Sequence, residues 1–132
     1  MSDLPQDAEL VFSYGPGDAI SDGLLAVGSD DLQARVARCS PTFPLGAIVY
    51  TPGASEVAER SGSSIDTAFG DVLERYAHRD WGDVCPEDAE ENDLSLEHGY
   101  RLLGSYAIGG ETVWVITEAD RALTTILTPA EY

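Results

Sequence analysis

The sequence predicts an α+β fold in which an N-terminal arm and several helices pack on a small antiparallel sheet, with a meander of strands ending the chain. Three observations support this fold class. The clearest helical period lies in mid-chain, at residues 65–76, and a second helix pattern follows at residues 87–98. Nearly all of the chain from residue 100 to residue 127 then has the pattern of consecutive strands separated by short turns. Helices followed by strands that are neighbours in sequence are typical of α+β domains.

The central helix is predicted by its first turn and by an apolar stripe. Ser63 or Ser64 is a suitable N-cap, and Asp66 places a negative charge near the positive end of the helix dipole. The stripe recurs at helical spacing and consists of Ile65, Ala68, Phe69, Val72, Leu73 and Tyr76. The next helix has Pro86 at its first position and Gly99 as its stop.

Two adjacent glycines predict a hairpin near the end of the chain. Gly109 and Gly110 separate strand patterns at residues 100–108 and 112–117, and paired glycines supply the positive φ of a tight turn. A further strand at residues 123–127 completes the predicted meander.

The first part of the chain alternates between short strands and helices. Strands are predicted at residues 9–14, 24–27 and 45–50, one or two helical turns at 15–23, a helix after the N-cap Ser29, and a helix at 54–60. The segment 40–44 contains two prolines and interrupts this pattern. The sequence therefore predicts an N-terminal arm or small subdomain at residues 1–40 and a main α+β domain at residues 45–132.

Charge is the strongest compositional feature of the chain. There are 24 acidic residues against 7 basic ones, every basic residue is Arg, and the net charge is -17. Binding to nucleic acid or to an anionic membrane needs basic patches, so we expect neither direct contact with a nucleic-acid backbone nor membrane binding. The acidity has two explanations. It can reflect adaptation to a salt-rich host, where screening suppresses self-repulsion, or it can imitate DNA towards a basic protein. The composition favours the first explanation and leaves the second open.

The motifs of common enzyme classes are absent from the sequence. It has no phosphate-binding glycine loop, no dinucleotide fingerprint, no nucleophile elbow and no zinc-protease helix motif. Cys39 and Cys85 stand at no metal-ligand spacing, which is typical of reduced thiols. No apolar run is long enough to span a bilayer, and the N-terminus lacks a signal-peptide pattern. We therefore expect a non-enzymatic protein with no catalytic residue, no cofactor and no metal, located in the cytoplasm or in a virion.

The first candidate site is an acidic segment that runs from Asp80 to Glu97 and contains no Lys or Arg. It fits either a solvated helix or a carboxylate site for a divalent cation, although its spacing does not match an EF-hand. Trp81 lies between two of the acids and is either a core anchor or a hot spot of a partner-binding face. The candidate protein-binding residues are Asp80, Trp81, Asp83, Glu87, Asp88, Glu90 and Glu91.

The second candidate lies in the turn after the hairpin. Glu118, Asp120 and Arg121 follow one predicted strand and precede the next. Their charges predict a mutual ion pair that fixes the turn, worth about 0–1 kcal/mol. Two carboxylates beside an arginine could alternatively carry out acid–base chemistry. Trp114 alternates with two valines in the preceding strand, so we expect it on the opposite sheet face, either as a core aromatic or as an exposed platform.

The main domain also carries a pattern of residues shared with a known group of proteins. These residues are Gly46, Thr51-Pro52-Gly53-Ala54, Asp80-Trp81-Gly82-Asp83, Glu87-Asp88, Glu91-Asn92, Arg101-Leu102-Leu103, Tyr106, the run from Trp114 to Arg121, Thr124-Thr125 and Glu131-Tyr132. On these residues the stretch 45–132 resembles a family of small proteins carried by plasmids, prophages and integrative elements, sometimes labelled a type I restriction M subunit. That label is not supported, because the chain has neither a cofactor-binding glycine motif nor an Asn/Asp-Pro-Pro-aromatic catalytic motif.

A second stretch, at residues 9–27, has its own resemblance. Phe12-Ser13-Tyr14 together with Ala19-Ile20-Ser21-Asp22-Gly23-Leu24-Leu25 is similar to the opening of another mobile-element family. Neither resemblance implies an activity or a catalytic residue.

Together these observations predict a non-enzymatic accessory protein of a mobile genetic element or virus that acts by binding another protein, with counter-defence as the more specific form. One alternative is a minor structural component of a virion. The other is a small carboxylate-based metal protein or enzyme that uses Asp80, Asp83, Glu118 and Asp120. The sequence leaves the identity of the partner and the oligomeric state open.

Overall fold

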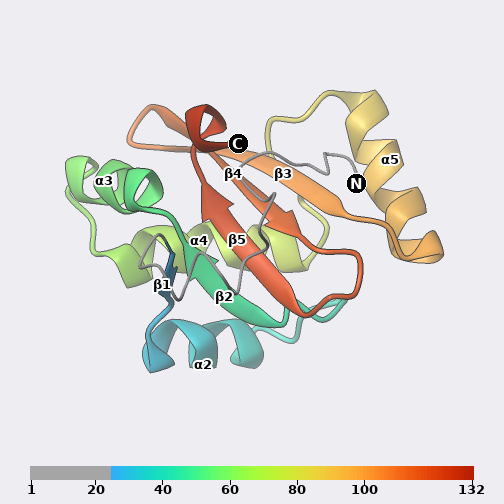
Figure 1. The fold of residues 1–132 in the computed structure, drawn as a ribbon, viewed down its shortest axis with the longest axis horizontal. Helices are drawn as coiled ribbons and strands as arrows, with labels where there is room; N and C mark the ends of the chain where they lie inside the picture. Colours follow the sequence, from blue (N-terminus) through green and yellow to red (C-terminus); the bar gives the residue numbers. More distant parts are fainter. Residues whose placement is uncertain (1–24) are drawn as a thin grey trace.

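The computed structural model describes residues 25–132, which form four helices and one five-stranded sheet (Figure 1). In chain order the elements are β1 (Ala26–Val27), α2 (Asp30–Arg38), β2 (Ala47–Tyr50), α3 (Pro52–Arg60), α4 (Ile65–Ala77), α5 (Pro86–His98), β3 (Leu102–Ile108), β4 (Glu111–Thr117), β5 (Leu123–Leu127) and the 3-10 turn η1 (Pro129–Glu131). Each helix and strand predicted after residue 25 is present, with ends that shift by one or two residues. The predictions for residues 9–14 and 15–23 lie outside the described residues.

The expected helix signals are confirmed in the backbone hydrogen bonds. The hydroxyl of Ser29 accepts the N–H of Leu32 at 3.0 Å, and the hydroxyl of Ser64 accepts the N–H of Thr67 at 3.1 Å. Gly99 ends α5 in the left-handed conformation at φ 76°, which glycine adopts without steric cost. The local sequence therefore sets where α2, α4 and α5 begin or end.

The strand order of the sheet is β1-β2-β5-β4-β3. The last three strands form the predicted antiparallel meander, so the α+β fold class is confirmed. The sheet is nevertheless mixed, because β2 joins β5 in parallel, with Ala47 opposite Leu123 and Tyr50 opposite Ile126. This pairing was not predicted, since three helices and the hairpin separate the two strands in sequence.

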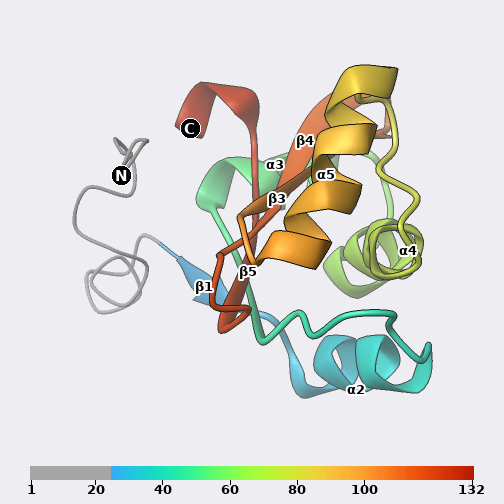
Figure 2. The same cartoon turned by 90° about the vertical axis from the view of Figure 1, so that its right-hand side faces the viewer.

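The helices α2, α4 and α5 lie on one side of the sheet (Figure 2). The apolar stripe of α4 faces the sheet, as its period predicted, and Phe69, Leu73 and Tyr76 are all buried. They belong to the same hydrophobic core as Val115 and Ile126 of the sheet. This layer of helix on sheet is the centre of the molecule.

The segment from residue 25 to residue 40 is part of this core. β1 pairs with β2, and Leu32 and Val36 of α2 lie in the same hydrophobic cluster as α4. Arg35 of α2 also forms an ion pair with α4 at the protein surface, with its guanidinium 2.6 Å from the exposed Asp71. The predicted boundary near residues 40–45 therefore does not separate two cores in the described part of the chain.

A chain of buried hydroxyl groups crosses the interface between α4 and the sheet. The Tyr76 and Thr117 hydroxyls lie 2.6 Å apart, the Thr117 and Thr124 hydroxyls 2.8 Å apart, and Thr124 donates to the carbonyl of Leu45 at 2.6 Å. Each hydroxyl has one proton, so Tyr76 must donate to Thr117, and Thr117 to Thr124. Burial is the main cause that raises the pKa of Tyr76, which keeps it a proton donor.

We predict that Tyr76→Phe destabilises the protein by about 1–3 kcal/mol, because the buried hydroxyl of Thr117 loses its donor. The free energy of unfolding measured in urea tests this. Tyr100→Phe is the matched control, since Tyr100 is exposed, and its change should be within about 0.5 kcal/mol. Equal stabilities of the two variants would contradict the role assigned to the hydroxyl chain.

Candidate functional site

The acidic helix α5 is attached to the sheet mainly by hydrogen bonds from polar side chains. The amide of Asn92 donates to the carbonyl of Leu103 at 2.7 Å and accepts its N–H at 3.1 Å. Asn92 and Ser95 are buried, whereas Ala89 and Leu96 are only partly buried against the core. The helix is therefore fixed to β3 by directional bonds, with little apolar contact.

The same contacts protect the edge of the sheet. β3 is an edge strand, and its Leu103 binds Asn92 while its Ser105 exchanges backbone hydrogen bonds with Trp81 and Asp83. Gly82 makes this close approach possible, because a Cβ there would collide with the carbonyl oxygen of Ser105. Covered edge strands cannot pair with the strands of other chains.

Trp81 lies in the hydrophobic core and is 5% exposed. Its ring packs against Phe43 at 5.9 Å and against Tyr76 at 5.4 Å between centroids, and its indole N–H donates to Asp93 at 3.3 Å. The structure thus supports the interpretation of Trp81 as a core anchor at the start of the acidic segment. It does not place this side chain on a partner-binding face.

Asp80 also has a local structural role. Its carboxylate accepts hydrogen bonds from Arg75 at 2.9 Å and from the N–H of Gly82 at 3.1 Å. The hydrogen bond from Arg75 is the main cause that lowers the pKa of Asp80. This carboxylate shapes the turn before α5 and is already paired.

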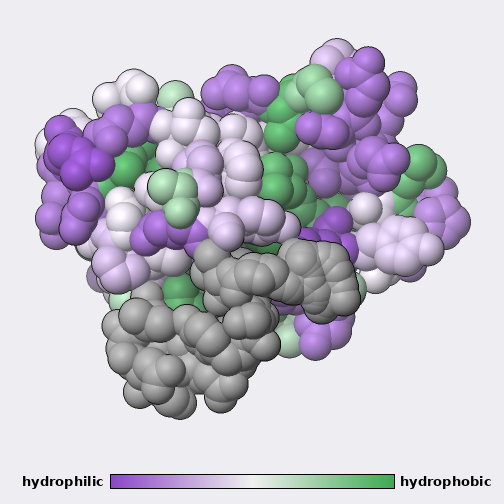
Figure 3. Space-filling model, turned by 45° about the horizontal axis from the view of Figure 1, so that its top comes forward, coloured by the Kyte–Doolittle hydropathy of each residue, from purple (hydrophilic) through white to green (hydrophobic). Residues whose placement is uncertain are grey.

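The remaining predicted binding residues are on the surface. Asp83, Glu87, Asp88, Glu90 and Glu91 are all exposed, and within the described residues none of them forms an ion pair. Figure 3 shows hydrophilic residues on the α5 side of the molecule, with a hydrophobic spot among them. The acids of the helix itself are Glu87, Asp88, Glu90, Glu91, Asp93 and Glu97, and it contains no Lys or Arg.

A hollow of about 680 Å³ borders the C-terminal half of α5. Its lining residues are Arg79, Glu90, Asp93, Leu94, Leu96 and Glu97. Leu94 is 51% exposed and is one of the few large apolar side chains on the surface of the described chain. The hollow therefore combines an apolar contact with three carboxylates and one arginine, Arg79, around it.

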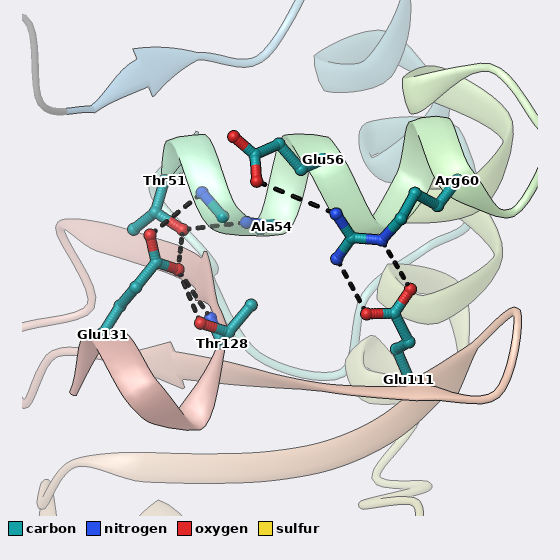
Figure 4. Close-up of polar contacts among 8 residues, drawn as sticks. Thr51, Ala54, Glu56, Arg60, Glu111, Thr128 and Glu131 are labelled. Atoms are coloured by element: carbon teal, nitrogen blue, oxygen red, sulfur yellow. Dashed lines mark hydrogen bonds and ion pairs between the residues drawn. The ribbon is translucent and has the colours of Figure 1, made fainter.

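Most arginines are already used by contacts elsewhere in the fold. Arg35 binds Asp71 and Glu74, Arg60 binds Glu56 and Glu111 (Figure 4), Arg75 binds Asp80, and Arg101 binds Glu118. Arg121 donates to backbone carbonyls, so only Arg38 and Arg79 have no such contact in residues 25–132. Four of the seven arginines are therefore paired with carboxylates outside α5, whereas Arg79 lies in the lining of the hollow beside α5 and Arg121 binds the carbonyl of Ser95.

The predicted ion pair of the second candidate site is wrong. Glu118 pairs with Arg101 at 3.2 Å, and Asp120 accepts the N–H of Ala122 at 3.0 Å. Arg121 donates instead to the carbonyls of Ser95, Tyr100, Glu118 and Ala119. The reason is that its guanidinium satisfies carbonyls at and just beyond the C-terminal end of α5, where the helix dipole favours a cation, and in its own turn.

The charged side chains of the two candidate sites do not line one hollow, although Arg121 of the second site donates to the carbonyl of Ser95 in α5. The hollow beside α5 is not lined by Glu118, Asp120 or Arg121. In residues 25–132 no group of three or more His, Cys, Asp or Glu side chains is placed to hold a metal ion. Asp80, Asp83, Glu118 and Asp120, the acids named for the metal or enzyme alternative, thus form no such group. No helix in the described part of the chain is long and apolar enough to cross a membrane.

Sequence analysis named Glu131 only within a shared pattern and gave it no role, whereas its carboxylate joins the end of the chain to the start of α3 (Figure 4). It accepts hydrogen bonds from the Thr51 hydroxyl at 2.5 Å, the Gly53 N–H at 2.9 Å and the Thr128 N–H at 2.9 Å. The signal was present, because Thr128 and Glu131 have the spacing of a capping box. Burial acts to raise the pKa of Glu131, but the hydrogen bonds, that from Thr51 first, outweigh it and lower the pKa.

We predict that Glu131→Gln lowers stability at neutral pH by about 1–2 kcal/mol, since a charge-assisted contact is weakened. The folded-state pKa is lowered, so the stabilisation is complete above the unfolded-state pKa of about 4.3 and is lost as pH falls through the folded-state value. Urea unfolding at a series of pH values should show the two proteins converging in acid. Glu59→Gln, at an exposed glutamate of α3, is the control and should run parallel to the native protein. A constant difference down to pH 2 would contradict the assignment.

Comparisons with known protein families, curated proteins and solved structures identified no relative of this chain. No family model matches the chain, and no curated protein or solved structure matches it significantly. The resemblance of residues 45–132 to a mobile-element family therefore stays a prediction.

Proposed function

We propose that this is a non-enzymatic accessory protein of a mobile genetic element or virus, and that it binds a basic protein partner through the outer face of α5. One observation carries the proposal. The helix presents six acidic residues and the exposed Leu94 without a single Lys or Arg of its own. A surface of that composition attracts a cationic partner and offers it one apolar contact.

The way in which α5 is held supports a binding role. Asn92 fixes its middle to β3, Arg121 binds the carbonyl of Ser95 near its end, and Trp81 donates to Asp93. These bonds fix the orientation of the helix before a partner arrives. A preorganised surface loses less conformational entropy on binding, so more of the contact energy appears as affinity.

The hollow beside α5 indicates the chemistry of the partner. Leu94 and Leu96 offer apolar contact, and three carboxylates, those of Glu90, Asp93 and Glu97, outnumber the one arginine of the lining, Arg79. The complementary surface has Lys or Arg side chains around one aliphatic or aromatic group. A DNA-binding protein of the host presents cations in this manner, so counter-defence by imitation of DNA is the specific form that we propose.

We predict that Glu90→Gln/Glu91→Gln weakens binding to the captured partner by about 5- to 10-fold, because two attractive charges are removed from the contact. The partner is first isolated from host extract at low salt, and affinity is then measured by interferometry at 50 and 500 mM salt. For the native protein we expect a steep loss of affinity at the higher salt concentration.

Asp31→Asn/Glu59→Gln is the matched control, because it removes the same net charge from exposed positions away from α5. Its affinity should stay within about 2-fold of the native value. Equal losses in both variants would show that total charge, and not α5, drives binding. Recovery of no partner at low or physiological salt would overturn the proposal.

A further inference from the structure

The acidic helix α5 and the core helix α4 have the same length but very different burial. Each has 13 residues. Seven residues of α4 are buried, and most of them are apolar, whereas α5 buries only the polar residues Asn92 and Ser95. Ala89 and Leu96 add contacts that are only partly buried. An isolated helix of this length is marginally stable in water, so α5 depends on a small set of contacts with the rest of the domain.

The sequence of α5 makes two unfavourable contributions of its own. Asn92, Asp93 and Ser95 are weak helix formers in its second half. Its carboxylates also repel one another, because like charges three or four positions apart are neighbours on a helix surface. The pairs at these spacings are Glu87 with Glu90, Glu87 with Glu91, Asp88 with Glu91, Glu90 with Asp93, and Asp93 with Glu97. The helix contains no Lys or Arg that would relieve this repulsion.

Arginines on neighbouring segments offset the repulsion only in part. Arg79 lines the hollow beside α5, but within residues 25–132 it forms no ion pair. Arg101 lines a smaller hollow between α5 and β3 together with Asp88 and Glu91, and its guanidinium is paired with Glu118. The repulsion within α5 therefore outweighs the attraction from its surroundings.

Dissolved salt changes this balance. The Debye length is about 10 Å at 0.1 M salt and about 3 Å at 1 M, so salt screens the charges of an exposed helix strongly. Screening also weakens two attractions, that of Glu87 and Asp88 for the helix dipole and that of the hollow for Arg79. The repulsive pairs are more numerous than these attractions. The net effect of salt is therefore to stabilise α5.

The chain is held in place on both sides of α5, so the helix can move as a unit. Trp81 lies in the core before the helix, and β3 begins at Leu102 after it. Gly99, at φ 76°, joins α5 to β3 through a short connection. The hydrogen bonds that hold the helix between these ends are those of Asn92 with Leu103, of Arg121 with the carbonyl of Ser95, and of Trp81 with Asp93. Loss of this small set of bonds frees the whole helix.

We infer that α5 is an ionic-strength switch. Residues 86–100 undock from β3 and unfold as one unit while α4 and the sheet stay folded, and the fraction of open molecules falls as the salt concentration rises. Regions with little buried apolar area open at a free energy below that of global unfolding. This inference does not rest on the proposed function, because the opening is a property of the chain alone.

Native-state hydrogen exchange of the full-length chain, followed by NMR at low urea concentrations, tests the switch. In 0.1 M KCl the α5 amides should exchange at least about 10-fold faster than the α4 amides. Their exchange should also depend less on urea, because a local opening exposes less surface than global unfolding. In 2 M KCl the protection of α5 should be about 5- to 10-fold higher than in 0.1 M.

Two variants of equal net charge test the cause of the salt effect. Glu90→Gln/Glu97→Gln removes exposed charges that take part in three of the repulsive pairs, so the gain in α5 protection from salt should fall to about 2- to 3-fold. Asp31→Asn/Glu59→Gln removes the same charge from exposed positions outside α5 and should leave the gain unchanged.

A third variant separates local from global opening. Ile126→Val weakens the core on the α4 side, where Ile126 is 0% exposed, and should lower the protection of α4 at least about 3-fold. The protection of α5 should change by less than about 1.5-fold, because α5 opens while the core stays folded.

Three results would overturn the inference. The first is equal protection and equal urea dependence of α5 and α4 at low salt, with Ile126→Val lowering both alike. The second is an α5 protection that stays the same from 0.1 to 2 M KCl. The third is a salt gain reduced as much in Asp31→Asn/Glu59→Gln as in Glu90→Gln/Glu97→Gln, because total charge would then be the cause.

Discussion

The buried hydroxyl chain between α4 and the sheet is the constraint on which the rest of the structure depends. Tyr76, Thr117 and Thr124 are each 0% exposed, and their bonds end at the carbonyl of Leu45, just before β2. Water cannot replace a lost partner there, so every link must be kept. A slip of one residue in β4 or β5 would turn the threonines to the other face and leave Tyr76 and Leu45 unsatisfied. The chain of hydroxyls thus favours one register for the central strands and fixes the point where β2 joins them in parallel.

The fixed centre of the molecule makes the unusual composition of α5 possible. A helix normally needs an apolar stripe to stay on its domain, and α5 buries only Asn92 and Ser95. Directional bonds replace the stripe, from Asn92 to the edge of β3 and from Arg121 to the carbonyl of Ser95. Such bonds work only if their partners are already held in place, which the sheet ensures. The outward positions of the helix are then free to carry acid without loss of the fold.

The sequence predicts the parts of this fold that depend on neighbours in the chain. Caps such as Ser64, the stripe of α4 and the turn at Gly109 are local, and the structure confirms them. Two other features join residues that are not neighbours in sequence, and no short pattern encodes them. They are the parallel pairing of β2 with β5 and the hydrogen bonds between Asn92 and Leu103. The site shows the same division. The exposed acids of α5 were predicted, whereas the ion pair expected at Arg121 was wrong, because carbonyls near the end of α5, which is distant in sequence, take its guanidinium instead.

The distribution of charge says more than its total. Adaptation to a salty host explains a net charge of -17, but it predicts acidic residues spread over the whole surface and no concentration of them on one helix. Elsewhere in the described chain the acids often have arginine partners, as Glu111 has in Arg60 and Glu74 has in Arg35. On α5 the carboxylates have no such partner, and they surround an exposed leucine. A uniform cause does not select one helix, so the local excess of acid on α5 is the feature on which our proposal of a cationic partner surface rests.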